Sequence, residues 1–143
     1  MALLNDRDQA AVRKEFEKIA GPVTLIVFSQ ELAAAELCRQ KEALVREVAA
    51  LARDQITVEV LNLAIDRERA EAYGIDRVPA IVVEGARDYG IRFLGVPAGY
   101  EFSNLIDAII VASSGAAGLT EETQRALSEL TADIDIKVFS TPT

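Results

Sequence analysis

The sequence contains no histidine and no tryptophan, and it has a single cysteine among its 143 residues. Without histidine, the chain can build neither an imidazole zinc site nor a histidine-based catalytic triad. One cysteine excludes an internal disulfide, a Cys-x-x-Cys pair and a metal cluster held by several thiolates. We therefore expect no metal and no cofactor. Aromatic residues make up 6% of the chain, too few for a platform on which the bases of single-stranded nucleic acid would stack.

Positive charge is also scarce. Lys and Arg number 15 against 23 Asp and Glu, which gives a net charge of −8. An acidic chain lacks the basic face that nucleic acids and anionic lipids require. No apolar run approaches the roughly 20 residues that span a bilayer, and charged residues follow Met1 too early for a signal peptide. We expect a cytoplasmic protein that binds neither nucleic acid nor membrane.

Half of the residues are hydrophobic, and their pattern predicts an α/β fold. A helix joins the first two expected strands, which should therefore be parallel, whereas a tight turn at Gly85–Asp88 should make the last two antiparallel. The result is a four-stranded mixed sheet flanked by helices, in the element order of a thioredoxin-like fold. We expect helices at 6–20, 32–53, 66–73 and 100–112, and strands at 23–28, 56–63, 79–84 and 89–94.

The C-terminal part of the chain repeats the order in which the chain begins, a helix and then a strand. Leu25–Ser29 reads LIVFS, and Ile136–Ser140 reads IKVFS. We interpret residues 1–113 as one thioredoxin-like unit, 114–119 as a linker and 120–143 as the helix and strand that open a second unit. The expected strand at 134–140 would add to its own domain or pair with a second copy, which gives a homodimer.

Several stretches resemble the protein disulfide oxidoreductases, which are glutaredoxin-like proteins built from tandem thioredoxin folds. The resemblance covers essentially the whole chain, as the first unit plus the beginning of the second. Its most specific part is the long stretch 88–102; the others are 27–29 with 38–40, 75–80 and 138–143.

The resemblance implies a Cys-x-x-Cys motif at the start of the long helix, and here the motif is incomplete. Cys38 aligns with the second, resolving cysteine, and the attacking position is occupied by Ala35. Thiol–disulfide exchange needs an attacking thiolate at the helix N-terminus. We therefore expect no dithiol activity. Cys38 is either a residual redox site or a small, partly buried helix residue, and we favour the second interpretation.

The resemblance also implies a cis peptide bond between Val78 and Pro79. In thioredoxin folds this turn faces the active-site helix, and the residue before the proline pairs with an extended substrate peptide. Val78 and Pro79 are therefore the expected peptide groove. The alternative is a proline that merely opens a strand.

Two functions follow from these observations. The first is a redox-degenerate thioredoxin-fold module that binds a protein partner or holds an assembly. The second is a thiol–disulfide oxidoreductase that works through Cys38 alone, by forming mixed disulfides with protein thiols or glutathione. We favour the first.

Overall fold

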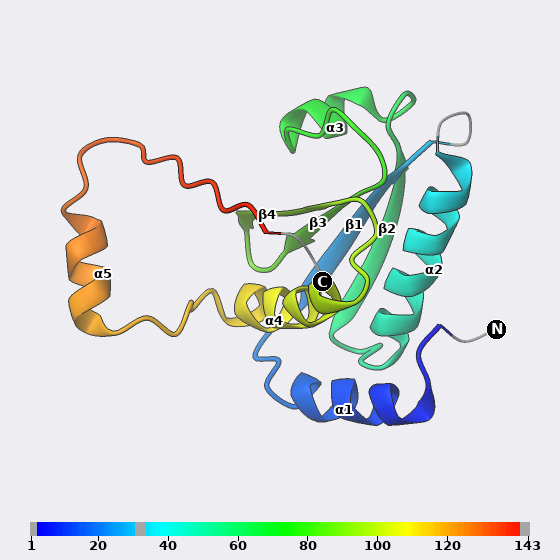
Figure 1. The fold of residues 1–143 in the computed structure, drawn as a ribbon, viewed down its shortest axis with the longest axis horizontal. Helices are drawn as coiled ribbons and strands as arrows, with labels where there is room; N and C mark the ends of the chain where they lie inside the picture. The colour runs from blue at the N-terminus through cyan, green and yellow to red at the C-terminus, as the bar shows by residue number, and fades with distance from the viewer. Residues whose placement is uncertain (1–2, 31–33, 141–143) are drawn as a thin grey trace.

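The computed structural model describes residues 3–30 and 34–140 of the chain. Its elements follow the expected order, with one helix before the sheet and one after the closing helix (Figure 1). The expected start of the long helix at Leu32, like the segment 141–143, lies outside the described residues. The helices are α1 (Asp6–Phe16), α2 (Ala35–Ala50), α3 (Arg67–Ala72), α4 (Tyr100–Ser114) and α5 (Glu121–Ser128); the strands are β1 (Val23–Ser29), β2 (Ile56–Asn62), β3 (Ala80–Glu84) and β4 (Asp88–Leu94).

The four strands form one mixed sheet in the order β2-β1-β3-β4. Strands β1 and β2 are parallel, with Val27 beside Val60, and β3 and β4 are antiparallel, with Ile81 beside Phe93. Both pairings were predicted from the connections. Strand β1 lies in the middle because β3 pairs antiparallel with its other edge. This is a thioredoxin-like fold.

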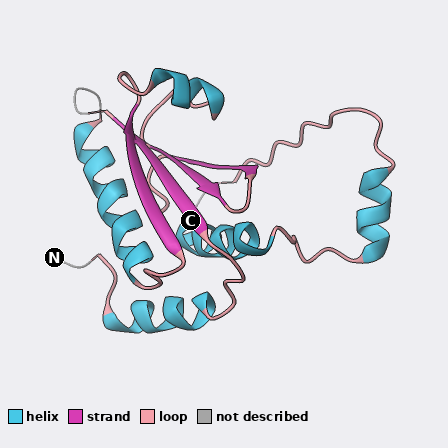
Figure 2. Ribbon diagram, turned by 180° about the vertical axis from the view of Figure 1, so that it is seen from behind, coloured by secondary structure: helices cyan, strands magenta, loops and turns pink. Residues whose placement is uncertain are grey.

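Helices cover both faces of the sheet (Figure 2). On one face α1, α2 and α4 pack over the residues of β1 and β3 that point to that side, such as Leu25, Val27 and Ile81. On the other face α3 contributes Ala70 to a smaller cluster around Phe28. Strand β1 is buried on both faces, as its continuous apolar sequence predicted.

The predicted strand at 134–140 is wrong. These residues belong to no strand, and every residue from 114 to 140 is exposed. The alternation of Ile134, Ile136 and Val138 provides an apolar face. A strand also needs the edge of a neighbouring strand for its hydrogen bonds, and the sequence pattern does not predict that neighbour. Helix α5 forms, because Thr120 caps its N-terminus by accepting from the backbone N–H of Thr123 at 3.2 Å.

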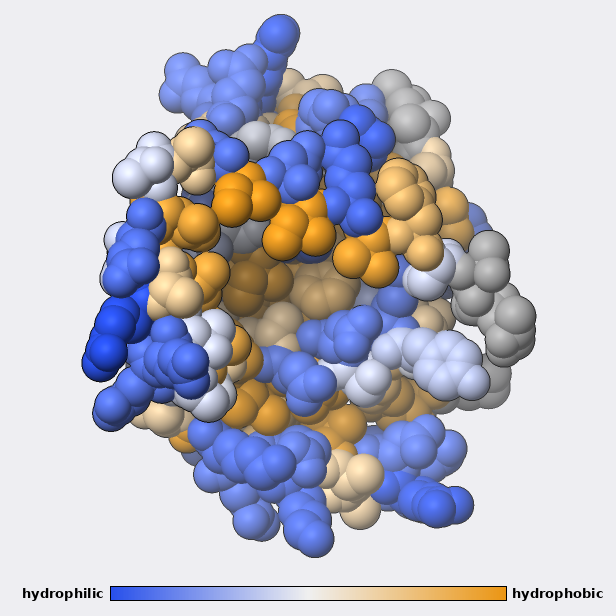
Figure 3. Space-filling model, turned by 60° about the vertical axis from the view of Figure 1, so that its left-hand side comes forward, coloured by the Kyte–Doolittle hydropathy of each residue, from blue (hydrophilic) through white to orange (hydrophobic). Residues whose placement is uncertain are grey.

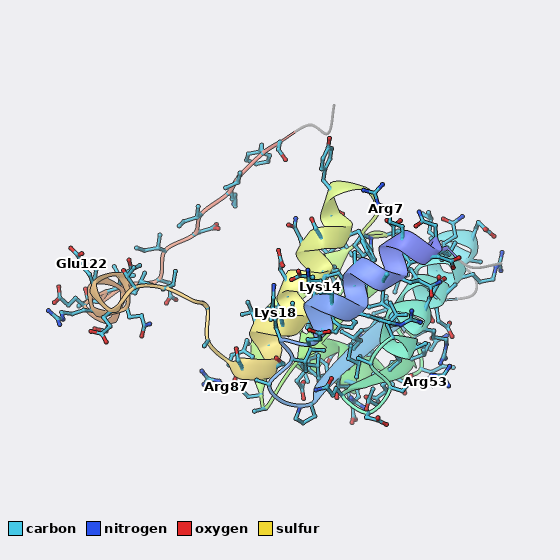
Figure 4. The ribbon with its side chains drawn as sticks, turned by 90° about the horizontal axis from the view of Figure 1, so that it is seen from below. Arg7, Lys14, Lys18, Arg53, Arg87 and Glu122 are labelled. Atoms are coloured by element: carbon cyan, nitrogen blue, oxygen red, sulfur yellow. The ribbon has the colours of Figure 1, made fainter. Side chains whose placement is uncertain are left out.

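Helix α5 and the segment after it, which we call the tail (residues 119–140), stand apart from the sheet and its covering helices. From below, Glu122 on α5 lies well away from Lys14 on α1 and from Lys18, which follows α1 (Figure 4). On the side where the tail comes forward, apolar side chains surround a hollow (Figure 3). The large apolar side chains that the tail exposes are Leu119, Leu127, Leu130, Ile134, Ile136, Val138 and Phe139.

Candidate functional site

The candidate site lies where α2 begins, as the sequence predicted. Ala35 is the first residue of α2, and Ala34 before it adopts a left-handed conformation with φ of 53° and makes no side-chain cap. The backbone N–H of Cys38 donates to the Ala34 carbonyl at 2.9 Å, which closes the first turn of the helix. Ala35 and Cys38 therefore occupy two positions one turn apart at a helix N-terminus, which is the arrangement that a Cys-x-x-Cys motif requires.

Cys38 itself is buried, with 5% of its surface exposed. Its side chain packs on the sheet side of α2, at the edge of a cavity of about 380 Å³. Ala35, the first residue of the helix, carries a methyl group at the position of an attacking thiol. The cavity is lined by Ser29, Gln30, Ala35, Cys38, Arg39 and Glu42.

The Val78–Pro79 peptide bond is cis, as the resemblance implied. Pro79 is buried, and Val78 is half-buried. The Pro79 carbonyl accepts from the backbone N–H of Gly95 at 2.9 Å, which ties the start of β3 to the loop after β4. Among the described residues, no hydrogen bond reaches the backbone of Val78. Its N–H and C=O are therefore available to an extended segment laid beside it.

Exposed apolar side chains come from the elements that meet at this end of the fold. Leu94 is the last residue of β4. It lies opposite Ala80, the residue after Pro79, where β3 pairs with β4. Leu37 comes from the first turn of α2, and Tyr100 is the first residue of α4. The exposed fraction is 49% for Leu37, 52% for Leu94 and 78% for Tyr100.

Sequence reasoning missed Lys41, which is completely buried on the inner side of α2. Its Nζ donates to the Pro79 carbonyl at 3.1 Å and to the Phe93 carbonyl at 2.8 Å. Burial lowers the pKa of Lys41 from 10.5 to about 7, while Cys38 and Glu101 act in the opposite direction. One signal was present in the sequence, because Lys41 has helical spacing with the buried residues Cys38 and Val45.

The described residues give no sign of a membrane span or a metal centre. Every helix in the described part of the chain falls short of the length and hydropathy that a bilayer crossing requires. Within the same residues, carboxylates and the thiol do not gather into a group that would hold a metal ion.

Comparison with known proteins found no family model that matches the sequence, but it found relatives that are similar over part of the chain. A probable thioredoxin from Methanothermobacter thermautotrophicus is 39% identical over 54 residues, which cover 38% of this chain and 59% of that protein. A probable thioredoxin from Methanothermobacter marburgensis is 43% identical over 44 residues, 31% of this chain and 47% of that protein. The match thus spans about half the length of these relatives.

Solved structures agree with the fold. A variant of an alkylhydroperoxide reductase from Enterococcus faecalis superposes with a TM-score of 0.81 at 25% identity, over 90% of this chain and 62% of that one. A protein disulfide oxidoreductase from Aeropyrum pernix superposes with a TM-score of 0.75 at 22% identity, over 91% of this chain and 56% of that one. The chain therefore has a thioredoxin-like fold, and part of it is similar in sequence to probable thioredoxins.

Proposed function

We propose that this chain is a redox-degenerate thioredoxin-fold module of the cytoplasm that binds a protein partner instead of exchanging disulfides with it. The observation that carries the proposal is Ala35 at the first residue of α2. The partial positive charge of the helix N-terminus favours a thiolate there, and an alanine methyl group can neither ionise nor attack a disulfide sulfur. The remaining thiol, Cys38, is one turn further on and 5% exposed.

The binding part of the proposal rests on the face beside the cis-proline. The backbone of Val78 has no hydrogen-bond partner among the described residues, and Leu94, which lies opposite Ala80, exposes 52% of its surface. An extended, apolar segment of a partner protein fits this combination, because its backbone would pair with Val78 and its side chains would cover Leu94.

The test restores the missing thiol. The Ala35→Cys variant should reduce insulin in the presence of dithiothreitol several-fold faster than the wild-type chain, because it completes the Cys-x-x-Cys spacing with Cys38. The Ala35→Ser variant is the matched control, since it changes the size of the side chain in the same way and supplies no thiol. The wild-type chain should be no more active than Cys38→Ser. Wild-type activity above Cys38→Ser would contradict the proposal.

A second candidate is thiol chemistry at Cys38 alone, with the resolving thiol supplied by another molecule. What favours it is that Cys38 lines the cavity of about 380 Å³ at the start of α2, so a small disulfide has a route to the sulfur. The measurement is alkylation of the folded chain by iodoacetamide at neutral pH. A rate above that of a free thiol in solution supports this candidate, and a slower rate removes it.

We further propose that residues 120–143 begin a second thioredoxin-like unit, after a linker at 114–119, and that the tail pairs with another chain. Its support is the exposed apolar surface of the tail, with Val138 at 85% and Phe139 at 90% exposure. Light scattering over a wide concentration range should detect a dimer of the full chain, and deletion of residues 119–143 should abolish it. A monomer at all concentrations would contradict the pairing.

A further inference from the structure

Lys41 connects three parts of the candidate site through one buried amine. It lies on α2, one turn after Cys38 in the sequence, and its Nζ bonds to the carbonyl of Pro79 and to that of Phe93 on β4. The two carbonyls come from residues 38 and 52 positions away along the chain. A single side chain therefore holds the turn that carries Cys38 against the cis-proline corner and against β4.

The charge of this amine has no partner of opposite sign within ion-pair distance among the described residues. The two bonds go to neutral carbonyls, and the charged groups whose fields reach Nζ are Cys38 on its own helix and Glu101 on α4. The strands against which α2 packs present apolar side chains, Leu25 and Val27 from β1 and Val58 and Val60 from β2. Burial thus disfavours the ammonium, and two carbonyl dipoles and Glu101 favour it.

Both protonation states of Lys41 can keep the two carbonyl bonds. An ammonium has three N–H groups and a neutral amine has two, so two donors remain after the proton is lost. Because burial outweighs the effects of Cys38 and Glu101, the pKa of Lys41 falls to about 7. In a chain without histidine, this lysine changes charge in the pH range in which imidazole usually does.

We propose that Lys41 is a positioning residue of this site, whose buried amine fixes the Cys38 turn against Pro79 and β4 in both protonation states and whose charge sets the electric field behind that face. Taking up a proton adds a positive charge beneath the cis-proline corner without breaking the two bonds that hold it. An anionic group on the face is favoured when Lys41 is charged and loses that attraction when Lys41 is neutral. This inference goes beyond the proposed function and does not rest on it.

The test is a pH titration of the folded chain followed by NMR, with no ligand present. Lys41 should titrate with a midpoint near 7, and the lysines Lys14, Lys18 and Lys137 are exposed. The amide of Gly95 reports on positioning, because it donates to the same Pro79 carbonyl as Lys41. Its resonance should shift with the midpoint of Lys41.

The Lys41→Met variant keeps the length of the side chain and removes the amine, so its Gly95 resonance should no longer respond near neutral pH. Lys14→Met is the matched control and should leave both titrations unchanged. Because the titration is observed directly in the wild-type chain, the test does not depend on how well the Lys41→Met variant folds. The proposal is overturned when Lys41 does not titrate near neutral pH, or when the Gly95 resonance does not follow its titration.

Discussion

At the scale of single residues, Lys41 ties folding to pH. The folded chain releases its proton near pH 7, while the unfolded chain keeps it until about 10.5. Between these values the unfolded state binds more protons, so the free energy of unfolding rises with pH. Below about pH 7 both states are protonated, and this contribution stops changing.

We therefore expect the wild-type chain to gain stability relative to Lys41→Met as the pH is raised from neutral to about 10, by on the order of 3 kcal/mol. Urea unfolding curves of both chains at several pH values measure this difference, and the change with pH matters, not the absolute stability of the variant. If the free energies of unfolding of the two chains changed equally with pH across that range, the amine would not be neutral in the folded state.

The residues of the candidate site were predictable to different degrees. Ala35 and Cys38 were assigned from the family resemblance, and their place in the first turn of a helix was predictable because a helix start is a local feature. Lys41 was not, because its two acceptors lie on a distant strand and a distant loop, and a lysine in a helix is normally exposed. The exposure of Leu37 and Tyr100 was equally hidden, since it depends on which elements meet at that end of the sheet.

At the scale of elements, the turn between β3 and β4 passes close to the end of α4. A Cβ atom at Gly85 would overlap the carbonyl oxygen of Ala112, which is backbone and cannot rotate away. Gly85→Ala should therefore lower the free energy of unfolding by about 1–3 kcal/mol, the usual cost of overpacking. Thermal unfolding measures it, with Ala86→Ser in the same exposed turn as the control. Equal melting temperatures for both variants would mean that α4 does not pack against this turn.

The helices and strands also show which structural features a sequence pattern cannot predict. The four strands of the sheet were predicted because buried strands have continuous apolar runs and because their connections determine their directions. The strand at 134–140 was predicted from alternation and is absent, because alternation predicts an apolar face but not the neighbouring strand with which it must pair. Helix α5 formed nevertheless, since a helix satisfies its hydrogen bonds within itself.

At the scale of the whole molecule, the sheet with α1 to α4 should be stable without the tail. Every residue from 114 to 140 is exposed, so removing the tail uncovers no core. Deleting residues 119–143 should leave the free energy of unfolding unchanged within about 0.5 kcal/mol. Urea unfolding of the shortened and full chains makes the comparison. A loss of several kcal/mol would mean that the tail packs against the sheet in solution.

The central place of β1 also has a consequence for synthesis. During synthesis on the ribosome, β1 and β2 emerge before β3. The other edge of β1 pairs with β3, where Thr24 of β1 lies opposite Glu84 of β3. Until residue 84 has been made, an apolar strand keeps an open edge, and a nascent chain is most prone to aggregate in that interval. The tail is synthesised after all four strands of the sheet, so its apolar side chains appear beside a finished domain instead of competing with β3 for β1.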